Sequence, residues 1–172
     1  MQIYKLLSTL LDYPDQDLLA YLPDLQDFVE QSPELDGAER EALQGFLGYM
    51  QQHSLTDLQA DYVQTFDMTA EHSLHLTHHL FGDDKNRGPA LIDLGELYKD
   101  YGVEFVSNEL PDYLPLILEF AAYLDDNEAT VFLSDAKKVL AVLTDNLQKA
   151  ASPYAALLSI IDNRATLTKL AA

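Results

Sequence analysis

Apolar residues recur along most of this chain at intervals of three and four, the spacing of one face of an α-helix. The pattern starts at Ile3, which is followed by Leu6, Leu7, Leu10 and Leu11 before Pro14 ends the run. No window of four to eight residues combines strict alternation with β-branched residues, so no strand is expected. The pattern therefore predicts an all-α fold.

Prolines, glycines and capping residues divide the pattern into segments. A second helix is expected over residues 15–31, where Pro23 predicts a break or a kink. Further helices are expected to begin near residue 38, after the cap-like Ser54, near residue 115 and after Ser152-Pro153. One more is expected from Pro89 to a glycine end at Gly102, and another over about residues 131–147. We therefore predict a bundle of about eight or nine helices in one domain, residues 1–172.

The stretch from Glu109 to Phe120 combines two prolines and three carboxylates with an apolar helix start. Pro111 and Pro115 fix φ and remove two backbone donors, which predicts a rigid lead-in to a helix. Asp112 is suited to the N-cap position and Pro115 to the first turn. The plain alternative is a well-capped helix start with no further role.

Composition is that of a globular protein, with 48% hydrophobic and 23% charged residues. There is no cysteine, which excludes disulfides, thiolate metal sites, iron–sulfur ligation and cysteine nucleophiles and fits a reducing cytosol. The N-terminus lacks the features of a signal peptide, and no apolar run approaches the roughly 18 residues of a membrane span. A cytoplasmic protein is expected.

The net charge of −19 is uneven, with −14 in residues 1–84 and −5 in residues 85–172. Such a surface repels nucleic acid and anionic lipid and attracts basic partners. Solubility alone is the alternative explanation of this charge.

Few residues suggest catalysis or metal binding. His72, His75 and His79 would share one face if their segment were helical, so a histidine-dependent metal-binding or metal-delivery protein is the alternative hypothesis. No Glu is followed by His three residues later, as in di-iron bundles, and there is no glycine-rich phosphate loop or Gly-x-Ser-x-Gly elbow. We therefore predict neither an enzyme nor a resident cofactor.

Three segments, 62–67, 73–88 and 109–119, mix aromatic residues, fixed turns and carboxylates. Such segments could form a groove for a basic amphipathic helix, with apolar anchors for affinity and acids for orientation and association rate. The alternative is that the aromatic side chains are core and the acids are surface.

The same segments carry a family resemblance. The matching positions are Leu6, Leu7, Leu10, Leu11, Tyr13, Pro14 and Asp15; Tyr62 to Asp67; Ser73 and Leu74; His79, Gly82, Asp83, Arg87, Gly88 and Ala90; Tyr98; Gly102; and Glu109 to Phe120. In these positions the chain resembles the nitrate reductase assembly chaperones, or delta subunits, of the NarJ, TorD and DmsD group of redox-enzyme maturation chaperones. The resemblance extends from about residue 3 to about residue 162.

The resemblance implies a TorD-like, non-catalytic, cytoplasmic chaperone. It would bind the basic N-terminal segment of the apo catalytic (alpha) subunit of respiratory nitrate reductase. It would hold that subunit during molybdenum cofactor and iron–sulfur insertion, before docking to the membrane. The peptide-binding residues on this hypothesis, with Glu109 and Asp112 as a charged rim, are Tyr62, Phe66, Leu74, His79, Asp83, Arg87, Gly88, Glu109, Leu110, Pro111, Asp112, Tyr113, Pro115 and Glu119.

Tyr113 departs from the family pattern, because many relatives carry His there. A role that depends on titration of that His would not transfer, although Tyr keeps a ring and a hydrogen-bonding tip. The hypothesis also predicts that Asp112→Ala weakens peptide binding with little loss of helix. Sequence leaves open whether the chain is a monomer or a swapped dimer.

Overall fold

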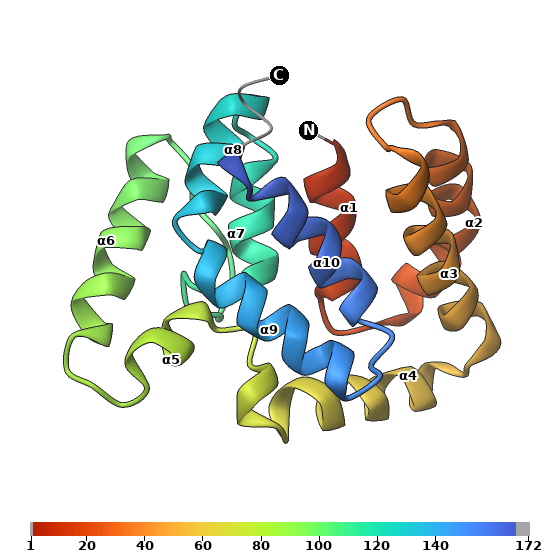
Figure 1. Ribbon diagram of the computed structural model, residues 1–172, viewed down its shortest axis with the longest axis horizontal. Coiled ribbons are helices and arrows are strands. Elements are labelled where there is room, and N and C mark those ends of the chain that lie inside the picture. The colour runs from red at the N-terminus through yellow and green to blue at the C-terminus, as the bar shows by residue number, and fades with distance from the viewer. Residues whose placement is uncertain (1, 168–172) are drawn as a thin grey trace.

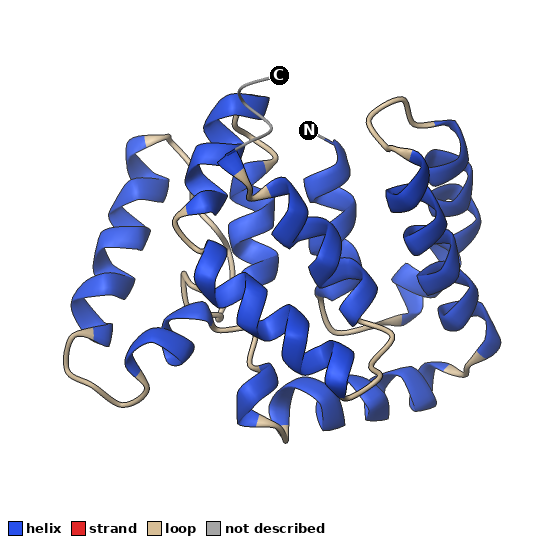
Figure 2. Ribbon diagram, in the orientation of Figure 1, coloured by secondary structure: helices blue, strands red, loops and turns tan. Residues whose placement is uncertain are grey.

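The computed structural model describes residues 2–167, and helices make up almost all of the regular structure there (Figures 1 and 2). The α-helices are α1 (Gln2–Leu11), α2 (Gln16–Gln31), α3 (Gly37–Gln52), α4 (Leu55–Tyr62), α5 (Leu76–Phe81), α6 (Arg87–Asp100), α7 (Leu114–Ala121), α8 (Asp126–Ser134), α9 (Lys137–Lys149) and α10 (Ala155–Arg164). A π-helical turn, Val63–Asp67, extends α4, and a 3-10 turn covers Ala70–His72. Across residues 2–167 no strand forms, so the predicted all-α class is confirmed.

The structure has more helices than predicted because the segment 131–147 is part of two helices, α8 and α9, and because α5 forms where no regular helix was predicted. The chain turns at Asp135 and Ala136, where the Ala136 N–H donates to the Leu133 carbonyl at 3.0 Å, and α9 leaves in a new direction (Figure 1). The apolar spacing continues across this turn, so the sequence pattern does not reveal it.

Of the break or kink predicted at Pro23, the break is wrong, because α2 continues through this residue to Gln31, and the kink stays a prediction. Proline removes one N–H from the helix ladder. Pro23 is exposed, so water can hydrate the carbonyl that loses its donor.

Side chains cap several helix starts. Ser54 accepts a hydrogen bond from Asp57 N–H and begins α4 as predicted. Asp36 and Glu39 form a reciprocal capping box at α3, and Asp125 and Glu128 form another at α8. Each cap of this kind stabilises its helix by about 0.5–2 kcal/mol.

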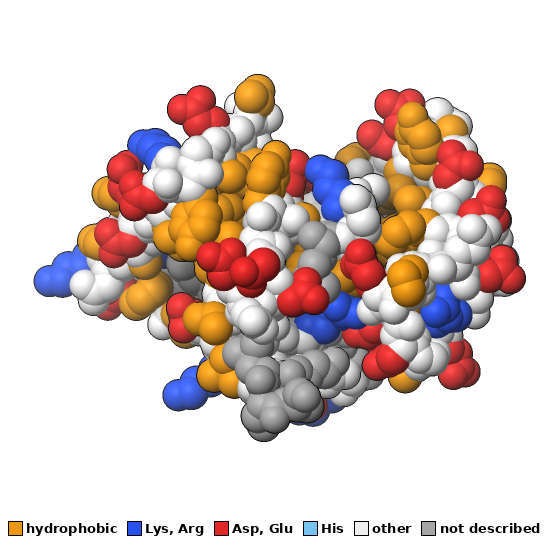
Figure 3. Space-filling model, turned by 90° about the horizontal axis from the view of Figure 1, so that it is seen from above, with side chains coloured by type: hydrophobic (Ala, Val, Ile, Leu, Met, Phe, Trp, Pro, Cys, Tyr) orange, Lys and Arg blue, Asp and Glu red, His pale blue; other side chains and the backbone are white. Residues whose placement is uncertain are grey.

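The core lies where α1 packs on α7 and where α9 packs on α10. The helices α2 and α3 form a hairpin, and α3 also contacts α10. In the view from above, a notch separates the α2–α3 side from the rest of the molecule, and red carboxylates outnumber blue basic groups (Figure 3). No helix in residues 2–167 has both the length and the hydrophobicity needed to span a membrane.

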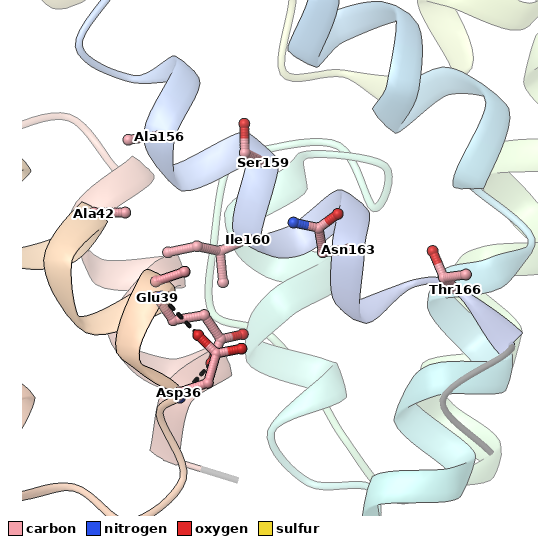
Figure 4. A pocket seen from close by; sticks show the side chains of 9 residues that line it. Asp36, Glu39, Ala42, Ala156, Ser159, Ile160, Asn163 and Thr166 are labelled. Atoms are coloured by element: carbon pink, nitrogen blue, oxygen red, sulfur yellow. Dashed lines mark hydrogen bonds between the residues drawn. The ribbon is translucent and has the colours of Figure 1, made fainter. Parts of the chain in front are cut away.

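A buried ion pair fastens α10 to α3. The Arg164 guanidinium donates to both carboxylate oxygens of Glu39 at 2.7 Å and to the Glu34 carbonyl at 2.8 Å. The side chains of Arg164 and Glu39 are only 12% and 8% exposed. Glu39 also borders a pocket of about 640 Å³ between α3 and α10. Ile160 and Asn163 of α10 line the same pocket (Figure 4).

Helix α6 stands at the edge of the bundle (Figure 1). Tyr98 is its one buried residue, and its hydroxyl donates to the Pro111 carbonyl at 2.7 Å. Gly102 follows the helix with φ of +72°, a left-handed conformation that favours glycine, so the predicted glycine end of this helix is confirmed.

Candidate functional site

The segments 73–77 and 110–114, far apart in sequence, are hydrogen-bonded side by side. The Leu76 N–H donates to the Asp112 carbonyl at 3.1 Å, and the Leu114 N–H donates to the Leu74 carbonyl at 2.8 Å. The rings of His75 and Tyr113 stack with centroids 5.2 Å apart. Two of the three segments singled out in the sequence therefore form one structural unit.

Asp112 is buried within this unit, with 1% of its surface exposed, so its predicted place on a charged rim is wrong. Its Oδ2 atom accepts hydrogen bonds from the Thr77 N–H at 2.9 Å and the Thr77 hydroxyl at 2.5 Å. Because Thr77 lies in the first turn of α5, Asp112 caps that helix and not α7. The N-cap of α7 is Tyr113, and Pro115 occupies the first turn as predicted.

The predicted aromatic residues Tyr62, Phe66 and Tyr113 are also buried. The Tyr62 hydroxyl donates to the Leu11 carbonyl at 3.0 Å, and the hydroxyls of Tyr62 and Tyr113 are 2.7 Å apart. Tyr113 also donates to Asp12 Oδ1 at 3.2 Å. This cluster joins α1, α4 and the lead-in to α7, so these rings position the site from within the core.

Burial raises the pKa of Tyr62, Tyr98, Tyr113 and Tyr154 above the ordinary value of 10.0, so the folded state keeps these phenols neutral. The unfolded chain releases their protons near pH 10, so stability is full below that pH and falls as pH rises above it. Each tyrosine contributes at most about 1.4 kcal/mol per pH unit. We expect urea denaturation to show a lower free energy of unfolding at about pH 11 than at about pH 9, with the loss beginning near pH 10. Tyr113→Phe should make the loss shallower, because it removes one of these buried phenols.

The remaining predicted residues lie at several places around the unit. Asp83, Gly88, Glu109 and Leu110 are exposed. Leu74 and Pro115 are buried, and His79, Arg87, Pro111 and Glu119 are half-buried. Glu109 Oε2 is 3.2 Å from His75 Nε2, and Glu119 Oε1 is 2.9 Å from Lys5 Nζ. The structure therefore brings together only part of the predicted set.

The histidines do not share one helical face, which overturns the geometry assumed for the metal alternative. His72 lies in the 3-10 turn, His75 precedes α5, and His79 lies within it. His72 Nδ1 is 3.0 Å from the Thr65 carbonyl oxygen, and His79 Nε2 is 2.7 Å from that of Ser73. In residues 2–167 no group of three His, Asp or Glu side chains is placed to hold a metal ion.

An apolar groove of about 480 Å³ lies between α5, α6, α7, α8 and α9, and we call it the α5–α9 groove. Of the fourteen predicted residues, Asp112 alone lines it. The full lining is Leu76, Thr77, Leu80, Phe81, Ala90, Asp93, Leu94, Leu97, Asp112, Ile117, Phe132, Leu133, Asp135, Ala136 and Val139. Leu80 is 59% exposed at its edge, whereas Leu76, Ile117 and Leu133 are buried beneath it.

The charged groups of the groove all have one sign. Asp93 and Asp135 are exposed and Asp112 is buried, and the described lining includes neither lysine nor arginine. The sequence carried a partial signal for one wall, since Ala90, Leu94 and Leu97 have the spacing of one helical face. The other walls come from α5, α7, α8 and α9, and only the folded structure shows that these helices meet at the groove.

The structure is thus that of an all-α helical bundle with an acid-lined apolar groove between α5 and α9, and no strand forms in residues 2–167. The family model described as the nitrate reductase delta subunit matches residues 32–159. The chain belongs to this family, and the resemblance seen in its motifs is confirmed.

Curated relatives agree with this assignment. The nitrate reductase molybdenum cofactor assembly chaperone NarJ of Escherichia coli K12 is 36% identical over 156 residues, which cover 91% of this chain and 66% of that protein. The probable chaperone of the same name from Bacillus subtilis is 33% identical over 159 residues, covering 92% of this chain and 85% of that protein. The chain thus spans just under two thirds of the length of the Escherichia coli relative.

Proposed function

We propose that this protein is an assembly chaperone of respiratory nitrate reductase that binds the basic N-terminal segment of the apo catalytic subunit in the α5–α9 groove. The observation that supports this most directly is the groove itself, which is apolar along its walls and whose charged lining groups, among the residues that the structure describes, are all carboxylates. Family membership and the names of the relatives support the choice of client.

The groove suits an amphipathic helix laid along it. Leu80, Leu94 and Phe132 are partly exposed and can cover an apolar stripe of the client, with burial worth about 1.5–3 kcal/mol for each large side chain fully covered. Asp93 and Asp135 are exposed and would attract the basic residues of the client.

On this proposal the protein acts as a chaperone because the groove holds the N-terminal segment of the client and does not modify it chemically. While the groove is occupied, the N-terminal segment of the client is unavailable to other partners, which would delay docking of the catalytic subunit until its cofactors are inserted. On this proposal the protein acts in the cytoplasm, has no catalytic activity and carries no cofactor of its own.

Titration of the client's N-terminal peptide into the chain by calorimetry tests this proposal. By calorimetry we expect micromolar or tighter binding at about 50 mM salt. In a separate measurement of binding rates we expect about 500 mM salt to slow association more than it speeds dissociation. Association should slow because salt screens the exposed carboxylates, which act mainly on the rate of encounter. Absence of heat at micromolar concentrations and low salt would contradict the proposal, as would binding whose association rate is indifferent to salt.

A further inference from the structure

Helix α6 is the least deeply buried wall of the α5–α9 groove. It has 14 residues and buries only Tyr98, whereas the 8 residues of α7 bury six. One face of α6, which includes Leu94, lines the groove, and the neighbouring face, which includes Gly95, lines a second pocket of about 290 Å³. A helix with open space along two of its faces has room to move.

Two side chains attach α6 to the rest of the bundle through polar contacts. At its N-terminal end, Arg87 Nε donates to the Thr77 hydroxyl oxygen at 3.0 Å, and Arg87 Nη2 is 3.8 Å from Asp112 Oδ2. Near its C-terminal end, the Tyr98 hydroxyl donates to the Pro111 carbonyl at 2.7 Å. Among residues 2–167, no other side chain of α6 forms a hydrogen bond or ion pair outside the helix. Breaking the Tyr98 contact would therefore free the C-terminal half of α6.

The connection that follows α6 allows such a movement. In the described part of the chain, the backbone of residues 104–109 makes no hydrogen bond to another backbone group. Each residue of an extended chain spans up to about 3.3–3.6 Å, so this segment can follow a displacement of several ångströms without breaking secondary structure. The segment 110–114 beyond it stays in place, because it is hydrogen-bonded to the segment 73–77.

The floor of the groove is covered before a client arrives. Leu76, Ile117 and Leu133 line the groove, but they are only 5%, 5% and 1% exposed. The groove encloses about 480 Å³, whereas ten residues of helix with their side chains occupy about 1,400 Å³, so only one face of a client helix can enter it. A client that packs against the floor must displace a wall. Of the five helices that form the walls, α6 buries the fewest residues.

We propose that α6 is a gate, which rotates outward about its Arg87 end to admit the client, and that the hydrogen bond from Tyr98 to Pro111 is the latch that holds this gate closed. The inference rests on the proposed function and deepens it, because it assigns a positioning residue and the movement that uncovers the groove floor. Tyr98 is not among the residues that line the groove, so it acts on the client only through α6.

The latch lowers the affinity for the client, because only the molecules whose gate is open can bind. Removing the latch raises the open fraction and should therefore strengthen binding. A tyrosine that served only to stabilise the site would have the opposite effect, since its loss would weaken binding. The direction of the change thus separates the two roles.

Tyr98→Phe removes the latch and keeps the ring, which packs on Phe105 and Phe120 with centroids 5.2 and 4.8 Å away. We expect this variant to bind the client's N-terminal peptide about two- to tenfold more tightly by calorimetry, and to associate with it faster. Tyr101→Phe is the matched control, because it removes a hydroxyl from a residue 52% exposed just beyond the same helix. Its effect should be less than about twofold. Unchanged or weaker binding by Tyr98→Phe would overturn the inference.

A reversible disulfide tests the same movement in the opposite direction. The chain has no cysteine, and a Cβ atom at Gly95 would lie 3.8 Å from Pro111 Cγ, so Gly95→Cys and Pro111→Cys are placed to form one. We expect the oxidised double variant, verified by mass spectrometry, to bind the peptide at least about tenfold more weakly than the same protein after reduction. Each single variant should bind equally with and without reductant. Equal binding by the oxidised and reduced double variant would overturn the inference and leave the proposed function standing.

Thiol labelling of the groove floor tests the gate without any client. Ile117→Cys places a thiol beneath the groove, and Leu158→Cys, at a residue 0% exposed in α10, places one in the core away from it. If α6 opens locally, a maleimide should react with position 117 at least about tenfold faster than with position 158. Equal rates would show that the floor is exposed only by global unfolding and would overturn the inference. Fast labelling at position 117 without binding of the peptide by the unsubstituted chain would reject the proposed function and leave the opening of α6 standing.

Discussion

Replacing Leu80 by lysine should weaken binding of the client's N-terminal peptide by about 30-fold or more. Leu80 is 59% exposed at the edge of the α5–α9 groove, so the substitution should leave the fold intact. It removes an apolar anchor worth about 1–2 kcal/mol and places a positive charge where a basic client would lie. Calorimetric titration of the peptide into the variant measures the effect.

Ile92→Lys is the control for this substitution. Ile92 is 65% exposed on α6 but is not among the residues that line the groove, so the change in charge and in exposed apolar area is closely matched. We expect less than about a threefold change, caused by long-range repulsion alone. Equal weakening by the two variants would show that net charge, and not the groove, governs binding.

Replacing Arg164 by methionine should lower the free energy of unfolding by about 3–5 kcal/mol. The substitution leaves the carboxylate of Glu39, whose side chain is 8% exposed, buried without its partner. It also removes the donor to the Glu34 carbonyl and so loosens α10 from the α2–α3 connection. Urea denaturation followed by circular dichroism measures the loss.

Two variants separate the charge from the packing. Arg164→Met combined with Glu39→Gln should recover part of the loss, because glutamine removes the buried charge and keeps an acceptor for the α3 cap. Lys149→Met breaks a surface pair with Asp145, in which the side chains are 72% and 56% exposed, and should cost less than about 1 kcal/mol. A similar cost for Arg164→Met and Lys149→Met would contradict a structural role for the buried pair.

The sequence predicted the helical class well because apolar periodicity and caps are local signals. The helix from Ile3 to Leu11, the Ser54 cap and the end at Gly102 all depend on residues within a few positions of one another. The turn between α8 and α9 was missed because residues 134–136 contain neither glycine nor proline and the apolar spacing runs across them.

The site was predicted less well because its determinants lie far apart in sequence. Asp112 has the residue type and position of a helix cap, but the N–H that it accepts belongs to Thr77, 35 residues earlier. The groove takes its walls from residues 76 to 139 on five helices, so no single stretch of sequence displays it. The motif residues Tyr62 and Tyr113 instead join α1, α4 and the lead-in to α7 within the core.

The most direct measurement is a photo-crosslink from the groove to the client. The chain has no cysteine, so Leu80→Cys and Ile92→Cys each provide a single attachment point for a benzophenone maleimide. With the apo catalytic subunit, we expect a crosslink from position 80 that is lost when the client's N-terminal segment is removed, and little or none from position 92. Crosslinks of equal yield from both positions, or a crosslink from position 80 that survives the truncation, would contradict binding of that segment in the α5–α9 groove.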